Sequence, residues 1–151
     1  MKPKRILLVI FQLTVIVALS NSCKYNDNQN SADVIIYGGT SAGISGAIQT
    51  ARLGKSVVLI EPTRRLGGLT TGGLGQTDIA NKQVIGGIAR EFYRNIKKHY
   101  EDSSNWIWQV RSEYKDGGQT RSGKDEDAMW TFEPSAALSV YHEMIQNLKI
   151  T

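Results

Sequence analysis

Glycines and small hydroxyl residues between positions 38 and 43 form a pattern that can bind a phosphate group. Read as G-x-G-x-x-G, it has Gly38 first, Gly43 last and Thr40 in the middle. The first glycine makes a sharp turn, and the helix that follows offers free backbone N–H groups to a pyrophosphate. The hydroxyls of Thr40 and Ser41 can also donate to phosphate oxygens. The candidate cofactor-binding residues of this turn are Gly38, Gly39, Thr40, Ser41, Ala42 and Gly43.

Glu61 is the second candidate for nucleotide chemistry. It lies 18 residues after Gly43, close to the spacing of about 20 residues at which dinucleotide-binding folds place a carboxylate. A carboxylate there accepts hydrogen bonds from the hydroxyls of an unphosphorylated ribose. Pro62 follows directly and cannot donate to a sheet, so the preceding strand is expected to end at the acid.

The segments around these residues have the patterns needed to hold them in place. Residues 33–37 and 56–60 are β-branched runs of the kind that a buried parallel strand needs. Between them, apolar residues recur at helical spacing through residues 42–53, and Gly54 follows where a left-handed cap would end the helix. This order predicts an α/β fold that begins with a Rossmann-like βαβ unit. A βαβ unit with a purely structural role is the alternative.

A glycine-rich segment, RRLGGLTTGGLG at residues 64–75, follows the acid. Nicotinamide enzymes usually begin another helix at this place, so the segment favours a flavin cofactor. A guanidinium here can pair with diphosphate oxygens, and Arg65 is a better candidate than Arg64 because it lies beside the Gly67-Gly68 pair. The alternative is a flexible surface loop with two solvated arginines.

Several motifs together resemble a known family. They are YGGTSAG at residues 37–43, Glu61, GGL at 67–69, GGLG at 72–75, GGIAREF at 86–92 and WTFEP at 130–134. The combination resembles the secreted bacterial family of FAD dependent oxidoreductases, within the glutathione-reductase-like FAD-binding superfamily. Thr40 in place of the second glycine is a feature of that family. The resemblance implies FAD as the cofactor, with Arg65, Gly67 and Gly68 lining its diphosphate and flavin.

The resemblance also bears on what the chain can do alone. Relatives are much longer, so we expect residues 33–151 to be a truncated, partial FAD/NAD(P)-binding domain that binds the ADP and diphosphate part of FAD and is inactive by itself. The catalytic residues and the substrate are not identified, and relatives often carry histidine where this chain has Ser135. An NAD(P)-binding protein and a lipid-anchored, non-catalytic binding module are the alternatives.

The amino-terminal segment has the order of an export signal. Three cations precede an apolar run at residues 6–19, which is too short to span a membrane comfortably. These cations are Lys2, Lys4 and Arg5. We expect a signal peptide at residues 1–22 and, because residues 24–31 are polar and rich in asparagine, a solvated tether at residues 23–32.

Cys23, the only cysteine, follows the sequence LSNS, which resembles a bacterial lipobox. We therefore expect lipidation of Cys23 and a periplasmic or outer-membrane-anchored lipoprotein of a bacterium, with membrane attachment through this anchor. An ordinary cleaved signal peptide and an uncleaved signal anchor are the alternatives. All three place the folded part outside the cytoplasm.

The remaining sequence contains two further amphipathic helices, one over residues 87–99 and one beginning at Pro134. His99 and His142 are expected at the surface, and the tryptophans and Tyr114 are expected to pack. Asp125, Glu126 and Asp127 are adjacent rather than at metal-ligand spacing, so we expect solvated carboxylates and no metal site. The formal net charge of +4 includes the three leader cations, and nothing predicts binding to nucleic acid.

Overall fold

The computed structural model describes residues 31–76, 80–115 and 126–151. The chain divides into two units, Met1–Ser31 and Ala32–Thr151. The predicted signal peptide, Cys23 and nearly all of the tether lie outside the described residues, so the following description concerns the second unit. Among the helices described, none combines the length and the apolar character needed to cross a bilayer.

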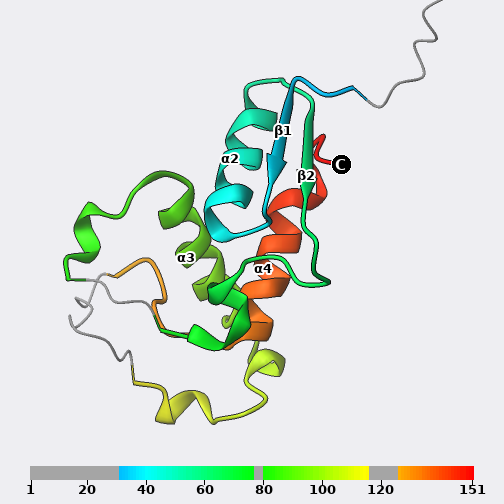
Figure 1. The fold of residues 1–151 in the computed structure, drawn as a ribbon. Coiled ribbons are helices and arrows are strands. Elements are labelled where there is room, and N and C mark those ends of the chain that lie inside the picture. Colours follow the sequence, from blue (N-terminus) through cyan, green and yellow to red (C-terminus); the bar gives the residue numbers. More distant parts are fainter. Residues whose placement is uncertain (1–30, 77–79, 116–125) are drawn as a thin grey trace, which may run out of the picture. The chain divides into compact units, whose positions relative to one another are not determined.

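The second unit begins with two parallel strands joined by a helix (Figure 1). Strand β1 is Val34–Tyr37, helix α2 is Ser41–Arg52 and strand β2 is Val57–Ile60. The strands pair in parallel, with Val34 opposite Val57 and Tyr37 opposite Ile60. The predicted order of strand, helix and strand is confirmed, with each element beginning within one residue of its expected position.

Helix α2 forms where the apolar spacing predicted it because that spacing places one stripe of side chains on the sheet. Ile44, Ala47 and Ile48 have no exposed surface. The helix ends at Arg52 with Leu53 as its C-cap, and Gly54 follows with a φ of 80°, which is the left-handed conformation expected of a glycine at this position.

Within the described residues, only one face of the sheet is covered. Burial alternates along β1, and 63% of Ile35 and 76% of Tyr37 is exposed. The expectation of fully buried strands is therefore wrong for this face, because α2 can cover only the side toward which it packs. Parallel sheets need a layer on each side to bury both faces.

The last residues pair with the free edge of β2. Thr151 N donates to Val57 O at 2.9 Å, and Leu59 N donates to Thr151 O at 2.8 Å. Ile150 forms a parallel bridge with Val57. Residues 150–151 therefore lie on the opposite side of β2 from β1, and Figure 1 shows the C-terminus beside this strand.

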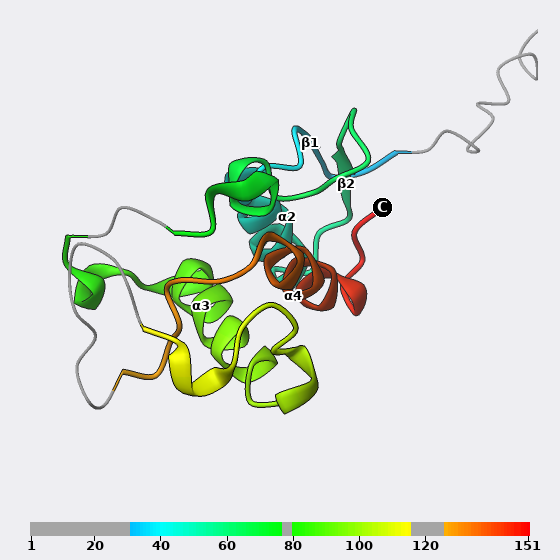
Figure 2. The ribbon, with the colours of Figure 1, turned by 90° about the horizontal axis from the view of Figure 1, so that it is seen from below.

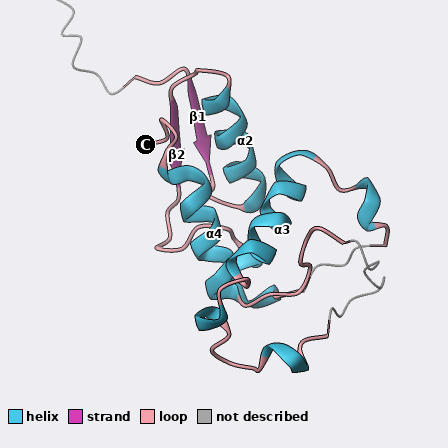
Figure 3. Ribbon diagram, turned by 180° about the vertical axis from the view of Figure 1, so that it is seen from behind, coloured by secondary structure: helices cyan, strands magenta, loops and turns pink. Residues whose placement is uncertain are grey.

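The connection from β2 to the C-terminus contains two long helices and several short ones (Figure 3). Helix α3 is Gly87–His99 and helix α4 is Pro134–Gln146, with the proline in its first turn as predicted. The short helices are a π-helical segment at Thr70–Leu74, which Gly73 interrupts with a φ of 124°, and 3-10 turns at Lys82–Val84, Ser103–Asn105 and Arg111–Glu113.

Aromatic side chains dominate the core where α4 lies beside α2 and α3 (Figure 2). Phe92 stacks on Tyr141 with ring centroids 4.5 Å apart, and Tyr93 lies 4.3 Å from Trp130. Trp130 is therefore packed as expected. Trp108 differs from that expectation because 81% of it is exposed.

Glu126 and Asp127, in the acidic run before Trp130, pair with arginines of α3. Glu126 bonds to Arg90 at 2.6 Å and its side chain is 6% exposed, while Asp127 pairs with Arg90 and Arg94. Hydrogen bonds from Arg90, which has the larger effect, and from Arg94 lower the pKa of Asp127 to about 2. The expectation of a solvated carboxylate is wrong for Glu126, because α3 brings Arg90 against this segment. Asp127 is paired and its side chain is still 42% exposed, and Asp125 lies outside the described residues.

Candidate functional site

The glycine turn after β1 and the glycine-rich loop after β2 meet at the carboxyl ends of the two strands. Gly67 N donates to Gly39 O at 2.6 Å. Thr40 and Gly67 form a parallel bridge beyond the named strands. Ligands of open α/β sheets bind at this edge, and the structure brings the two predicted groups of residues together there.

The turn itself is as tight as its sequence predicts. Gly38 has a φ of 105°, a backbone conformation that residues other than glycine rarely adopt. An ideally placed Cβ on Gly43 would overlap the carbonyl oxygen of Gly38. The two glycines therefore allow β1 to run directly into α2 without a longer loop.

Thr40 caps the start of α2. Its Oγ1 accepts a hydrogen bond from Gly43 N at 3.2 Å, and its carbonyl oxygen accepts one from Ile44 N at 2.8 Å. The first N–H groups of an α-helix have no hydrogen-bond partner inside the helix. In α2 these groups include the main-chain N–H of Ser41 and that of Ala42. The first turn of α2 contains no acidic residue, so its positive end favours an anion.

Glu61 reaches back to the same turn. Its Oε2 accepts from Gly39 N at 2.7 Å and its Oε1 accepts from Thr63 N at 2.8 Å. Hydrogen bonds from Thr63, and then from Gly39, lower the pKa of the Glu61 carboxyl below its usual value. The side chain is therefore ionised at neutral pH, and an ionised carboxylate can accept about four hydrogen bonds, which leaves room for a ligand.

The loop after β2 is folded onto itself by its polar groups. Arg65 Nη1 donates to Thr71 O at 2.6 Å, and the fully buried Thr71 hydroxyl donates to Leu66 O. Arg65 thus braces the loop, with its other guanidinium donors available to a diphosphate. Arg64 is exposed.

Ser41 contributes differently from the sequence-based expectation. Its hydroxyl donates to Gly67 O at 3.2 Å and lies 2.7 Å from Thr70 Oγ1. That hydroxyl is therefore engaged by the neighbouring loop. The main-chain N–H of Ser41 is the group that the helix start presents to an anion.

Comparison with known proteins agrees with this geometry. A family model described as FAD dependent oxidoreductase matches residues 33–151. The chain belongs to the FAD dependent oxidoreductase family. A search of curated proteins found no match. The family implies FAD as the cofactor, which agrees with the prediction made from the glycine motifs.

The residues at the strand ends of this family member have the chemistry that could hold the adenosine and diphosphate part of FAD. The α2 start supplies N–H donors without a competing acid, Gly43 permits the tight turn, and Glu61 supplies an ionised acceptor. Thr40 and Ala42 are exposed beside these groups. Gly68 is exposed on the adjoining loop, and Thr40 lies within 3.6 Å of the position that a Gly68 Cβ would take.

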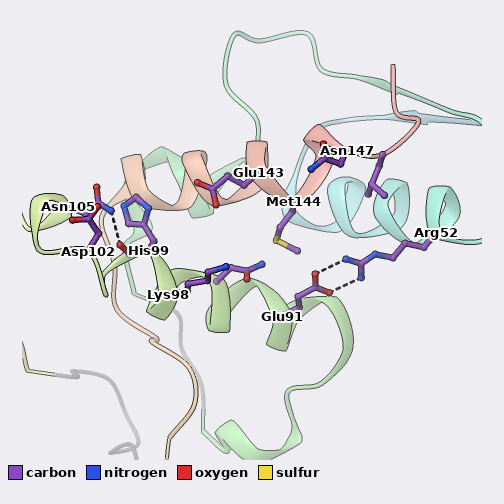
Figure 4. Close-up of a pocket in the computed structure, with 11 residues that line it drawn as sticks. Arg52, Glu91, Lys98, His99, Asp102, Asn105, Glu143, Met144 and Asn147 are labelled. Atoms are coloured by element: carbon purple, nitrogen blue, oxygen red, sulfur yellow. Dashed lines mark hydrogen bonds and ion pairs between the residues drawn. The ribbon is translucent and has the colours of Figure 1, made fainter.

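A hollow lies between α3 and α4, away from the strand ends (Figure 4). Its volume is about 550 Å³, and Arg52 and Glu91 close one end through paired hydrogen bonds of 2.7 and 2.6 Å. Figure 4 shows His99 and Asp102 at the other end. None of the predicted cofactor residues lines it. Within residues 31–76, 80–115 and 126–151, no cluster of three or more histidine, cysteine or acidic side chains could hold a metal ion.

Proposed function

We propose that this chain binds the adenosine and diphosphate half of FAD at the carboxyl ends of β1 and β2. The observation that carries the proposal is the contact of Gly67 with Gly39 and Thr40, because it joins the phosphate turn to the second glycine loop. Glu61 bonds to the same turn. The pairing of residues 150–151 with the outer edge of β2 supports a Rossmann-like sheet order.

Each residue has a separate task in this proposal. The amides of Ser41 and Ala42 bind diphosphate oxygens at the helix start, and Arg65 adds a positive charge to the loop. Glu61 accepts hydrogen bonds from the ribose hydroxyls and disfavours a phosphorylated ribose at that place. The bound flavin supplies the redox chemistry, while these residues fix its position and orientation. The docked glycine loop does not favour a nicotinamide cofactor.

Retention of flavin is the direct test. The full chain, kept in mild detergent because residues 6–19 are apolar, is refolded with excess FAD and freed of unbound cofactor by gel filtration. We expect the absorbance spectrum to retain the flavin bands, and excess ADP to reduce the retained FAD because ADP contains the half that these residues bind. A folded chain that emerges without flavin would contradict the proposal.

Replacement of Glu61 by glutamine should weaken FAD binding. Glutamine keeps one oxygen for Gly39 N but removes the charge, and hydrogen bonds to a charged group contribute about 1.5–3 kcal/mol each. We expect the FAD dissociation constant, measured by flavin fluorescence, to rise by about tenfold or more. The control is Glu113→Gln, an exposed carboxylate in a 3-10 turn outside the site; equal constants for both variants would exclude Glu61 as a ligand.

The proposal also includes export and attachment to a membrane through Cys23. It rests on the order of cations, apolar run and lipobox-like sequence, all outside the described residues. We expect the chain expressed in a bacterium to fractionate with membranes and Cys23→Ser to leave that fraction. A wild-type chain recovered from the cytoplasm with residues 1–22 intact would contradict export.

A further inference from the structure

Two hydroxyl groups join the start of α2 to the second glycine loop. Ser41 is the first residue of α2, and Thr70 is the first residue of the π-helical segment. Their side-chain oxygens lie 2.7 Å apart, and Ser41 Oγ also donates to Gly67 O at 3.2 Å. A hydroxyl has one proton to donate, so Thr70 is the donor to Ser41. This hydroxyl pair of Ser41 and Thr70 therefore forms an ordered chain of hydrogen bonds that ends on the carbonyl oxygen of Gly67.

The carbonyl oxygen of Gly67 accepts hydrogen bonds from two elements. Thr70 N donates to it at 3.2 Å from within the loop, and the Ser41 hydroxyl donates to it from α2. The hydrogen bonds among Ser41, Thr70 and Gly67 therefore close a ring. Gly67 is buried and has a φ of 97°, a conformation that glycine adopts readily. The ring thus fixes a backbone turn that has no side chain of its own to hold it.

Gly67 is also the residue through which the loop contacts the phosphate turn. Its N–H donates to Gly39 O at 2.6 Å, and it forms the parallel bridge with Thr40. Both polar backbone groups of Gly67 are therefore bonded to the connection between β1 and α2, the N–H to Gly39 and the C=O to Ser41. The hydroxyl pair adds a side-chain connection to this main-chain one, between the two walls of the proposed diphosphate site.

Neighbouring threonines differ from Thr70 in what their hydroxyls hold together. Thr71 is fully buried and its hydroxyl donates to Leu66 O, within the same loop. Thr50 donates to Gly46 O at 2.7 Å, within α2. Of these three threonines, Thr70 is the one whose hydroxyl contacts a side chain of another element. Loss of the Thr70 hydroxyl should therefore change how the loop lies against α2, and should leave each element intact.

We propose that Thr70 is a positioning residue for the cofactor, which holds the loop at residues 66–70 against the start of α2 through Ser41. The inference rests on the proposed function. Thr70 needs no contact with FAD in this role. It keeps the Ser41 main-chain N–H and the Gly67 turn in the arrangement that binds the diphosphate, and preorganisation of this kind increases affinity because less ordering is left for the binding step.

The test compares substitutions of two threonines in the full chain. Thr70→Val removes the hydroxyl at nearly constant shape, and Thr70→Ser keeps it. Thr50→Val is the matched control, because it removes a hydroxyl that bonds within α2. We expect the FAD dissociation constant to rise about three- to tenfold in Thr70→Val, the equivalent of one hydrogen bond. It should stay unchanged in Thr70→Ser and in Thr50→Val.

Two further measurements separate positioning from general stability. Ser41→Ala should also weaken FAD binding, and the double variant with Thr70→Val should bind FAD no more weakly than Ser41→Ala alone, because Thr70 acts through the serine hydroxyl. In the chain without FAD, amide exchange at Gly67 should be faster in Thr70→Val than in Thr50→Val, while the urea midpoints of these two variants remain similar.

Three results would overturn the inference in distinguishable ways. If the unsubstituted chain binds no FAD, the proposed function is wrong and the inference falls with it. If that chain binds FAD and Thr70→Val binds it as tightly as Thr70→Ser, only the positioning role is wrong. Additive losses of affinity in the double variant would also exclude the role, because Thr70 would then act independently of Ser41.

Discussion

Replacement of Gly43 by alanine is expected to abolish FAD retention, while Gly46→Ala, one turn further along α2, is expected to leave retention intact. A Cβ on Gly43 would overlap the backbone oxygen of Gly38, which cannot move without opening the phosphate turn. A Cβ on Gly46 would lie 3.5 Å from Ile36 Cδ1, which is ordinary contact. The two substitutions add the same methyl group to the same helix, so only position distinguishes them.

The effect of Gly43→Ala should be large in binding and moderate in stability. Overpacking typically lowers the free energy of unfolding by about 1–3 kcal/mol. A loss of about 3 kcal/mol in binding free energy would raise the FAD dissociation constant about a hundredfold. Gly46→Ala should instead gain up to about 1 kcal/mol, since alanine is the better helix former. Urea unfolding followed by circular dichroism and FAD titration of both variants measure the two quantities. Equal FAD affinities would show that the turn is not the phosphate site.

Local sequence patterns were sufficient to predict the helices and the two strands. The predicted helix over residues 87–99 matches α3, and Pro134 begins α4 as expected. Periodicity succeeds here because each of these elements buries one stripe of its own side chains, which is a property of contiguous sequence. The parallel pairing of β1 and β2 follows from the helix between them.

Contacts between distant segments could not be predicted in this way. The hydrogen bond between Gly67 and Gly39 and the one between Ser41 and Thr70 join residues that are 28 and 29 positions apart. The sequence predicts that the Ser41 hydroxyl donates to a phosphate. In the structure this hydroxyl contacts Thr70 instead, and Thr70 belongs to a loop whose path the sequence does not determine.

The acidic run before Trp130 shows the same limit for charged residues. Charge runs are usually solvated, and the spacing of the sequence does not show which cation Glu126 pairs with. Its partner, Arg90, lies 36 residues earlier on the polar side of α3, with 14% of its side chain exposed. Arg90 also donates to Lys82 O at 3.0 Å and lies 5.2 Å from the Trp130 ring. These contacts attach α3 to the segment that leads into α4.

We expect Arg90→Ala to destabilise the fold by about 3–5 kcal/mol, because removal of one partner leaves the other charge of a buried pair uncompensated. Arg94→Ala, one turn along the same helix, is the matched control: its ion pair with Asp127 is between side chains that are 57% and 42% exposed, and exposed pairs contribute about 0–1 kcal/mol. Urea unfolding monitored by tryptophan fluorescence measures both. Equal losses of unfolding free energy in the two variants would mean that Glu126 is exposed to water in solution. A large loss for Arg90→Ala alone would show that this buried pair holds α3 against the approach to α4.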